Sequence, residues 1–381
     1  MEREHKRVGS VALVLLGVGV VILAADAATG RQRLGLPPVP VPADNQITLA
    51  KVALGQKLFE DKRLSATGEV SCATCHDRAK AFTDHRKTSL GIRQRASLRN
   101  APTLINAAFN TTQFGDGRSP SLEDQALHPF LNPVEMGLES HAPVLQLVRT
   151  DDVYVEAFKV AFGKTDTAIT MKEVIQAIAT FERTLIAGNS AFDRYYFGQQ
   201  KSVLTAAQKR GLRVFRNKGR CVSCHVIEQT TALFTDHQFH NIGVGIHNIQ
   251  NDLPRLVGEF LKTKRTMAEI DINVLSDAKT SELGRLAVTR SFEDIGAFKT
   301  PTLRNVAFTA PYMHDGSIKT LREAVVHHNN GGVTRKGDKV NAYLSGGIRP
   351  LALTKQEIDD LVSFMEALTS PMVTRGAKRG N

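Results

Sequence analysis

The stretches "CATCH" (residues 72–76) and "CVSCH" (residues 221–225) contain every cysteine of this 381-residue chain. Each has the C-x-x-C-H spacing by which two thiols form thioethers with a porphyrin and the adjacent histidine reaches its iron. A zinc site would need four ligands from one cluster, and a redox-active C-x-x-C pair gives no reason for a histidine after both copies. The sequence therefore predicts two haem c groups, attached through Cys72, Cys75, His76, Cys221, Cys224 and His225.

The N-terminal residues have the pattern of an export signal. A charged segment (residues 1–7) precedes a short apolar run (residues 11–25), and "ADA" (residues 25–27) resembles a cleavage site. Bacteria attach haem to thiols outside the cytoplasm. We therefore expect residues 1–27 to be a signal peptide, or an uncleaved membrane anchor, and the protein to act in the periplasm. Residues 28–45 are expected to form an extended Pro-rich leader.

Composition and periodicity limit the fold and the partners. The net charge of +11 is spread along the chain without a Lys/Arg block and without interleaved aromatic residues. This distribution does not indicate nucleic-acid binding; it favours a basic surface that attracts an acidic protein partner. Apolar residues recur at helical spacing in residues 170–188 and 354–368. We therefore expect a mainly α fold.

The two halves of the chain repeat each other. "GQKLF" (residues 55–59) and "GLRVF" (residues 211–215) precede the haem motifs. Downstream of the motifs an offset of 199 residues separates Pro102 from Pro301 and Asp116 from Asp315. Such a duplication predicts two cytochrome-c-like haem domains. Their expected bounds are residues 46–198 and 199–372, with a linker at residues 195–205 and a basic tail at residues 373–381.

A pair of histidines lies in "AVVHHNNGG" (residues 324–332). The offset of 199 residues maps His328 onto Pro129. If His328 is the sixth ligand of the C-terminal haem iron, its counterpart cannot be a ligand, because proline has no ligating side-chain atom. One iron would then have two axial protein ligands, and the other would stay open to a small molecule.

From residue 46 onward the chain resembles the bacterial dihaem cytochrome c peroxidase and MauG superfamily. The motifs that carry the resemblance, beside the haem motifs, are "RNAPTLINAAF", "SLEDQA", "NPVEMG", "FHNIGV" and "FKTPTLRNVAFTAPYMHDGS". The resemblance implies that His76 and His225 are proximal ligands, and that Gln125 and Glu135 line a peroxide pocket over the N-terminal haem. A carboxylate there can move a proton between the peroxide oxygens, whereas Gln125 can only form hydrogen bonds.

The resemblance also implies the ligands of both irons at rest. In peroxidases of the family a loop histidine blocks the N-terminal iron; the corresponding residue here is Ile92, and the nearby His85 is expected to be solvated. The sixth ligand of the C-terminal haem follows His314 by 14 residues and is His328, which leaves His327 solvated or supporting the ligand. Bis-His ligation lacks the thioether that raises the potential of a His/Met haem. The MauG-like branch is therefore favoured.

One position departs from the family. Gly115 stands where the family has a tryptophan between the haems, and the chain contains no tryptophan. Electron sharing between the irons would then use the porphyrin edges or Phe114. Tyr195 or Tyr196 would be the candidates for radical transfer to a partner, against the simpler alternative that both only pack.

A calcium ion between the domains is also implied by the resemblance. Its ligands would be Asn100 of "RNAPT" and the backbone carbonyls of Thr309 and Pro311. Such hard oxygen ligands suit calcium.

The resemblance implies an exported haem peroxidase-type oxidoreductase that acts on hydrogen peroxide and stores two oxidising equivalents on its haems. In MauG-like chemistry these would oxidise an aromatic residue, such as tryptophan, of a partner protein. The alternative is a cytochrome c peroxidase that draws electrons from a small cytochrome c or copper protein. A second alternative is a dihaem electron carrier without catalysis. A homodimer, and a partner surface in the insertion at residues 246–275, are left open.

Overall fold

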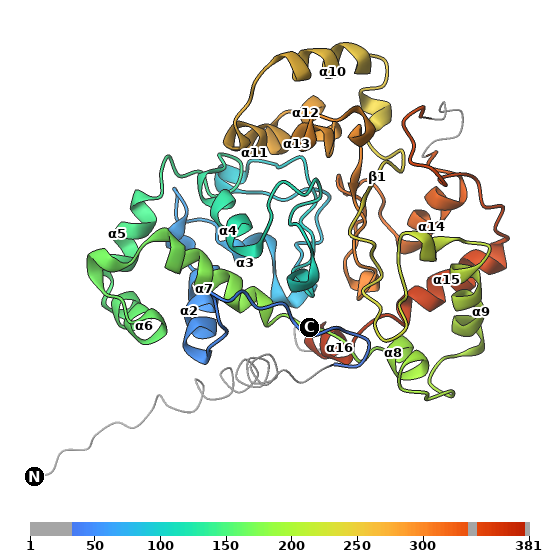
Figure 1. Cartoon of the computed structure of the whole chain (residues 1–381), viewed down its shortest axis with the longest axis horizontal. Coiled ribbons are helices and arrows are strands. Elements are labelled where there is room, and N and C mark those ends of the chain that lie inside the picture. Colours follow the sequence, from blue (N-terminus) through green and yellow to red (C-terminus); the bar gives the residue numbers. More distant parts are fainter. Residues whose placement is uncertain (1–32, 334–340, 378–381) are drawn as a thin grey trace, which may run out of the picture.

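The computed structural model describes residues 33–333 and 341–377. The predicted signal peptide, residues 1–27, lies outside the described residues. The fold is mainly α, as predicted, and its two halves stand side by side in Figure 1. Within the described residues the strands are β1 (Phe239–His240) and β2 (Phe298–Lys299), a short antiparallel pair. None of the described helices is both long enough and apolar enough to span a bilayer.

The N-terminal half comprises α2 (Leu49–Glu60), α3 (Cys72–Cys75), α4 (Leu122–Leu131), α5 (Ala142–Thr150), α6 (Asp152–Phe162) and α7 (Met171–Arg183). The C-terminal half comprises α8 (Ala191–Tyr196), α9 (Ala206–Arg216), α14 (Leu321–Asn329) and α15 (Lys355–Glu366). The remaining α-helices are α10 (Leu253–Lys262), α11 (Met267–Ser276), α12 (Ala278–Glu282), α13 (Leu286–Thr289) and α16 (Pro371–Ala377). Single 3₁₀ turns are η1 (Lys62–Leu64), η2 (Arg78–Lys80), η3 (Ile92–Gln94), η4 (Ala107–Phe109), η5 (Asp166–Ala168), η6 (Cys221–Ser223), η7 (Ile246–Asn248), η8 (Phe292–Asp294) and η9 (Val306–Phe308).

Each half is built on one closely packed helix pair, and a glycine allows the close approach. In the N-terminal half, α2 crosses α7 at Gly55, where a Cβ atom would overlap the carbonyl oxygen of Ala177. One turn further, the rings of Phe59 and Phe181 pack with centroids 5.2 Å apart. Only glycine lets two helix backbones approach this closely.

The C-terminal half repeats this packing between α9 and α15. A Cβ atom on Gly211 would overlap the carbonyl oxygen of Asp360, and the rings of Phe215 and Phe364 again lie 5.2 Å apart. The repeated G-x-x-x-F segment therefore marks the same helix crossing in both halves.

The duplication extends to the segments after the haem motifs. Asn106 and Asn305 both adopt the left-handed conformation, with φ of 67° and 62°, and each precedes a 3₁₀ turn, η4 or η9. The helices α4 and α14 also begin alike, because the side chains of Ser121 and Thr320 cap them at equivalent positions. Two haem domains related by duplication are therefore present in the three-dimensional structure.

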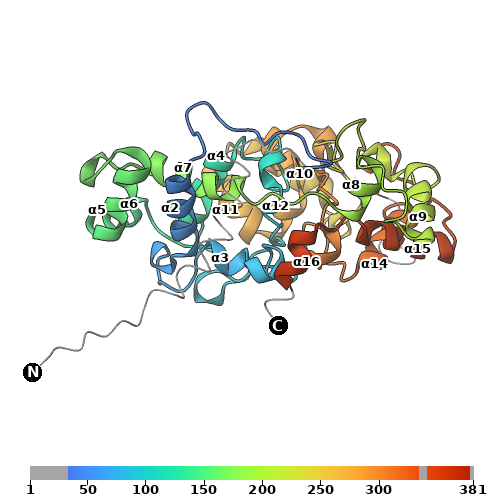
Figure 2. The same ribbon diagram turned by 90° about the horizontal axis from the view of Figure 1, so that it is seen from below.

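Both chain ends cross between the halves. The described part of the Pro-rich leader runs from the C-terminal half to the N-terminal half (Figure 2). Gly35 pairs with Thr231 of the C-terminal half, and the side-chain amide of Asn45 donates to the carbonyl of Gln176 in the N-terminal half. In return, α16 runs across the expected boundary at residue 372, and Val373 is buried in the core of the N-terminal half. The expected linker also differs, because α8 extends through Tyr196.

The insertion forms a small layer of its own. Helices α10 to α13 bury their apolar side chains in a separate cluster and lie along the top of both halves in Figure 1. The backbone N–H of Leu98 donates to the carbonyl of Leu275, which attaches α11 to the N-terminal half. The segment at residues 246–275 is therefore helical and reaches toward the N-terminal haem site.

Candidate functional site

The two motif histidines are held alike. Nδ1 of His76 lies 3.2 Å from the carbonyl oxygen of Phe82, and Nδ1 of His225 lies 2.8 Å from that of Phe234. A carbonyl accepts a hydrogen bond from Nδ1–H, which leaves the lone pair of Nε2 for a metal. Burial lowers the pKa of both rings, so that the neutral, ligating form is favoured.

The cysteines fit haem attachment better than the alternatives. None of the four cysteines forms a disulfide. Burial raises the pKa of the Cys72 thiol, and it raises the pKa of both Cys75 and Cys221 to about 12. A redox-active dithiol would need a lowered pKa. Within the described residues, the one cluster with metal-ligand geometry is Cys224, Asp236 and His240, which falls short of four zinc ligands. The residues present therefore fit two haem c groups.

The histidine pair on α14 divides into two roles. His328 is enclosed near His225; burial, together with His327 and His225, lowers its pKa to about 3. A neutral imidazole there would suit a second ligand for the iron of the haem that His225 would hold. Of the two alternatives for His327, solvation is wrong and a supporting position beside His328 is favoured, because its side chain is buried and Nε2 lies 2.8 Å from the carbonyl oxygen of Ile242.

At the N-terminal haem site, other residues occupy the positions from which a second iron ligand would be expected. Pro129 lies inside α4 where α14 has His328. Ile92 is buried, and its N–H donates to the carbonyl of Glu135 at 2.9 Å. His85 is exposed, and Nε2 lies 3.0 Å from the carbonyl oxygen of Phe308. None of these three side chains is placed as a ligand of the N-terminal iron.

Glu135 is a carboxyl group without a partner. Its Oε2 atom is buried and forms no hydrogen bond. Burial, and secondarily the charge of Asp271, raises the pKa of Glu135 to about 7. Burial chiefly, and the charge of Glu135 among smaller causes, raises the pKa of Cys72 and Cys75, so the carboxyl group lies near the N-terminal haem attachment site. Gln125 lies on α4, and its amide has no hydrogen-bond partner among the described residues.

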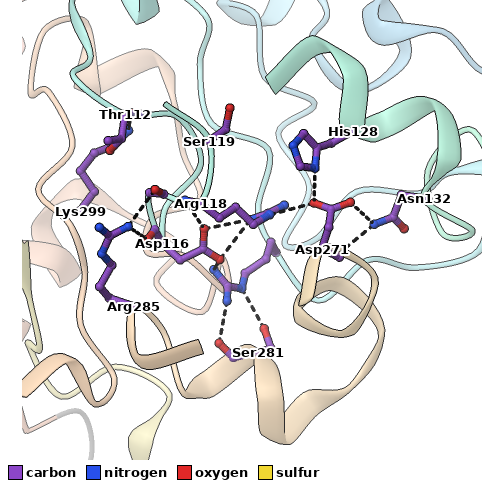
Figure 3. Close-up of polar contacts among 12 residues, drawn as sticks. Thr112, Asp116, Arg118, Ser119, His128, Asn132, Asp271, Ser281, Arg285 and Lys299 are labelled. Carbon is purple, nitrogen blue, oxygen red and sulfur yellow. Dashed lines mark hydrogen bonds and ion pairs between the residues drawn. The ribbon is translucent and has the colours of Figure 1, made fainter. Parts of the chain in front are cut away.

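The charged groups that act on Glu135 belong to a buried network around Asp271, whose contacts are drawn in Figure 3. Asp271, from α11 of the insertion, accepts from Nε of Arg118 at 2.8 Å and from Nδ2 of Asn132 at 3.2 Å. Nδ1 of His128 lies 3.4 Å from its Oδ1 atom. Arg118 also pairs with Asp116 at 3.0 Å. No motif marks Asp271, because it lies in the insertion, about 140 residues from its partners.

A phenylalanine from the other half lies beside the position of the family's tryptophan. A Cβ atom on Gly115 would lie 3.8 Å from the ring of Phe298. That ring stacks on His314 at 3.7 Å with an interplanar angle of 9°. Phe114 instead packs against the guanidinium group of Arg118, 3.5 Å from its ring centroid. Phe298 is therefore a second aromatic candidate, besides Phe114, for electron transfer between the halves.

The two tyrosines of the sequence analysis line a basic pocket on the C-terminal half. Its volume is about 590 Å³, and its lining residues are Tyr195, Tyr196, Lys201, Lys209, Leu212, Arg213, Arg216 and Asn217. Nζ of Lys201 and Nζ of Lys209 lie 5.4 and 5.5 Å from the ring centroid of Tyr195. Both tyrosines also pack on the core that contains Cys221.

The oxygens expected to hold calcium come from segments that meet between the halves. The N–H of Asn100 donates to the carbonyl of His314, and Ala310-Pro311 is a cis peptide bond. Within the described residues, neither the carbonyls of Thr309 and Pro311 nor Oδ1 of Asn100 accepts a hydrogen bond. These oxygens therefore fit a calcium ion by their chemistry.

The duplicated fold and the two C-x-x-C-H sites define a dihaem c-type cytochrome with unequal haem sites. The family model described as "Di-haem cytochrome c peroxidase" matches residues 49–201. Cytochrome-c peroxidase IdrP1 of Denitromonas iodatirespirans is 36% identical over 94% of this chain and 93% of its own length. Methylamine utilization protein MauG of Methylorubrum extorquens is 35% identical over 90% of this chain and 85% of its own length. The chain therefore belongs to the di-haem cytochrome c peroxidase and MauG family.

Solved structures agree with this assignment. A MauG-like protein associated with microbial copper homeostasis superimposes with a TM-score of 0.73 at 30% identity, over 90% of this chain and 96% of its own. The diheme peroxidase BthA of Burkholderia thailandensis superimposes with a TM-score of 0.65 at 25% identity, over 88% of this chain and 94% of its own. The protein is thus a haem peroxidase-type oxidoreductase with two haem c groups, as the sequence predicted.

Proposed function

We propose that the protein reduces hydrogen peroxide at the N-terminal haem, which has His76 as its single axial protein ligand. The observation that carries this proposal is the buried, unpartnered carboxyl group of Glu135, beside a helix with Pro129 at the position of a ligand. When bound, the haem would supply the coordination position for peroxide and the redox chemistry. The C-terminal haem, with His225 and His328 as axial ligands, would hold the second oxidising equivalent.

Side chains of the protein bind and transfer the protons of the reaction. Glu135 takes the proton from one peroxide oxygen and returns it to the other, so that water rather than hydroxide leaves. Its raised pKa, about 7, suits both steps near neutral pH. Gln125 donates a hydrogen bond to peroxide and cannot itself transfer a proton.

We propose a partner protein as the source of the electrons, with oxidation of an aromatic residue such as tryptophan as the MauG-like outcome. His328 in place of a thioether ligand favours this branch over a cytochrome c peroxidase fed by a small redox protein. The basic pocket at Tyr195 and Tyr196 suits an acidic partner and offers a route for radical transfer toward the core of the C-terminal half. A pure electron carrier is disfavoured because it has no use for Glu135 beside an open site.

Two further expectations belong to the same proposal. A calcium ion would join the halves through Asn100, Thr309 and Pro311. Export to the periplasm follows from the signal pattern of residues 1–27 and from the need to attach haem outside the cytoplasm.

Low-temperature electron paramagnetic resonance of the oxidised holoprotein tests the ligand assignment. We expect one high-spin signal from the open N-terminal haem and one low-spin signal from the bis-His haem. His328→Met should change the low-spin signal and raise the reduction potential of that haem, whereas His85→Met, at an exposed histidine, should change neither. Two low-spin signals at rest would contradict an open site and return the protein to a reductively activated peroxidase or a carrier.

A further inference from the structure

The reduction of peroxide consumes protons beside Glu135, whose Oε2 atom is buried in the protein. The balance is H₂O₂ + 2 H⁺ + 2 e⁻ → 2 H₂O, with the electrons supplied by the reduced partner protein. Glu135 can move a proton between the oxygens, but the two protons consumed must come from solvent. Because Oε2 of Glu135 is buried without a partner, the fold must supply a path to it.

A row of titratable side chains runs inward from the surface at α4. The side chain of Asp124 is 41% exposed, that of His128, one turn later, 15%, and that of Asp271 6%. Nε2 of His128 lies 3.4 Å from Oδ2 of Asp124, and Nδ1 lies 3.4 Å from Oδ1 of Asp271. An imidazole that faces a carboxylate on each side can accept a proton at one nitrogen and release it from the other.

Asp271 is held in a fixed relation to the turn that carries Glu135. Asn132 donates from Nδ2 to Asp271 at 3.2 Å, and its backbone carbonyl accepts from the N–H of Glu135 at 3.0 Å. Nε of Arg118 donates to Oδ1 of Asp271 at 2.8 Å. The inner end of the row is therefore linked through Asn132 to the turn that carries Glu135.

We propose that Asp124, His128 and Asp271 form a proton-delivery chain from solvent to Glu135, completed by helix α11 of the insertion. The proposal rests on the proposed function of Glu135. In it, each of the three residues is a positioning and relay group, because none touches peroxide itself.

The charges around His128 agree with a relay. It is faced by Asp124 on its own helix, Asp271 from α11, Arg118 from the preceding loop and Glu135 from the following turn. The hydrogen bond to Asp271 outweighs burial and raises the pKa of His128. The raised pKa favours the protonated imidazole, which has a carboxylate on either side with which to exchange the proton.

The test uses the full-length holoprotein, treated with hydrogen peroxide and then mixed with ferrocyanide as the electron donor, because the two solvent protons are taken up only as the electrons arrive. The stopped-flow rate of return to the resting absorption spectrum is measured from pH 5.5 to 8.5 in H₂O and D₂O. The variants are Asp271→Asn, His128→Gln and Asp124→Asn; the last is at the surface, where folding is not at risk. Asp252→Asn, an exposed carboxylate of the same insertion, is the control. All samples are first checked for an unchanged haem absorption spectrum.

We expect the return of the Asp271 and His128 variants to the resting spectrum, the step that takes up the protons, to be about tenfold slower or more at neutral pH. This deficit should shrink toward pH 5.5, where solvent protons are abundant, and the solvent isotope effect should increase. Asp124→Asn should show a smaller change of the same kind, and the control none. Wild-type rates in all three variants, or a deficit that is equal at every pH with an unchanged isotope effect, would overturn the chain. A wild-type protein that does not react with peroxide would instead overturn the proposed function.

Discussion

Replacement of Glu135 by glutamine keeps the shape of the side chain and removes the proton acceptor. The rate of the peroxide reaction should fall by about 10²–10⁴-fold, the usual contribution of a positioned general base. Glu135 has a pKa raised to about 7 by burial, so it must lose its proton before it can act as a base. The ionised fraction rises from about 1% at pH 5 to about half at pH 7, so the wild-type rate should rise about fiftyfold across this range.

The assay is the pH dependence of the stopped-flow peroxide rate in the wild-type holoprotein, Glu135→Gln and a control, Glu139→Gln. Glu139 is exposed and lies one turn later in the chain, so its replacement should leave both the rate and its rise with pH unchanged. Glu135→Gln should lose the rise between pH 5 and 7 as well as most of the rate. A slow Glu135→Gln variant that keeps the wild-type pH rise would refute the assignment, because another group would then be the base.

Two other predictions concern stability and are measured by urea unfolding of the holoprotein. Arg304 and Asp193 are fully buried and pair at 2.9 Å. Arg304→Met should lower the free energy of unfolding by about 3–5 kcal/mol, because it leaves the charge of Asp193 uncompensated. The double variant with Asp193→Leu should recover part of this loss, and an additive loss would contradict the pairing. Gly211→Ala should destabilise by about 1–3 kcal/mol, because its Cβ atom would overlap the backbone of Asp360. Gly258→Ala, with open space around it in α10, should stabilise by about 0.5–1 kcal/mol, and equal effects at both glycines would refute the packing argument.

Much of this fold could be predicted because its decisive contacts are local or repeated in the sequence. Haem attachment needs two thiols and a histidine within five residues, so the motifs define it without any tertiary information. The offset of 199 residues then aligned α4 with α14, and the structure gives both helices the same cap. The contrast between Pro129 and His328 therefore needed only the sequence.

The missed features depend on contacts between distant segments. Asp271 is one acidic residue in an amphipathic helix, and nothing in its neighbourhood distinguishes it from a solvated side chain. Its role appears only when α11 packs on the N-terminal half and brings it to Arg118. The choice between a solvated and a supporting His327 stayed open in the sequence for the same reason, because its partner, the carbonyl of Ile242, lies 85 residues away.

The offset of 199 residues also places His327 opposite His128, so the histidine pair contains one duplicated residue and one residue, His328, that we propose as a ligand. Each of these two histidines reaches from its helix toward the chain between the C-terminal haem motif and β2, but they meet different groups there. His327 meets a neutral backbone carbonyl, and burial lowers its pKa. His128 meets the carboxylate of Asp271, which raises its pKa. A neutral, fixed ring suits the neighbour of a permanent iron ligand, whereas a ring that exchanges protons suits a site that consumes them. The change of partner, together with the exchange of His328 for Pro129, accounts for two functions on one repeated helix.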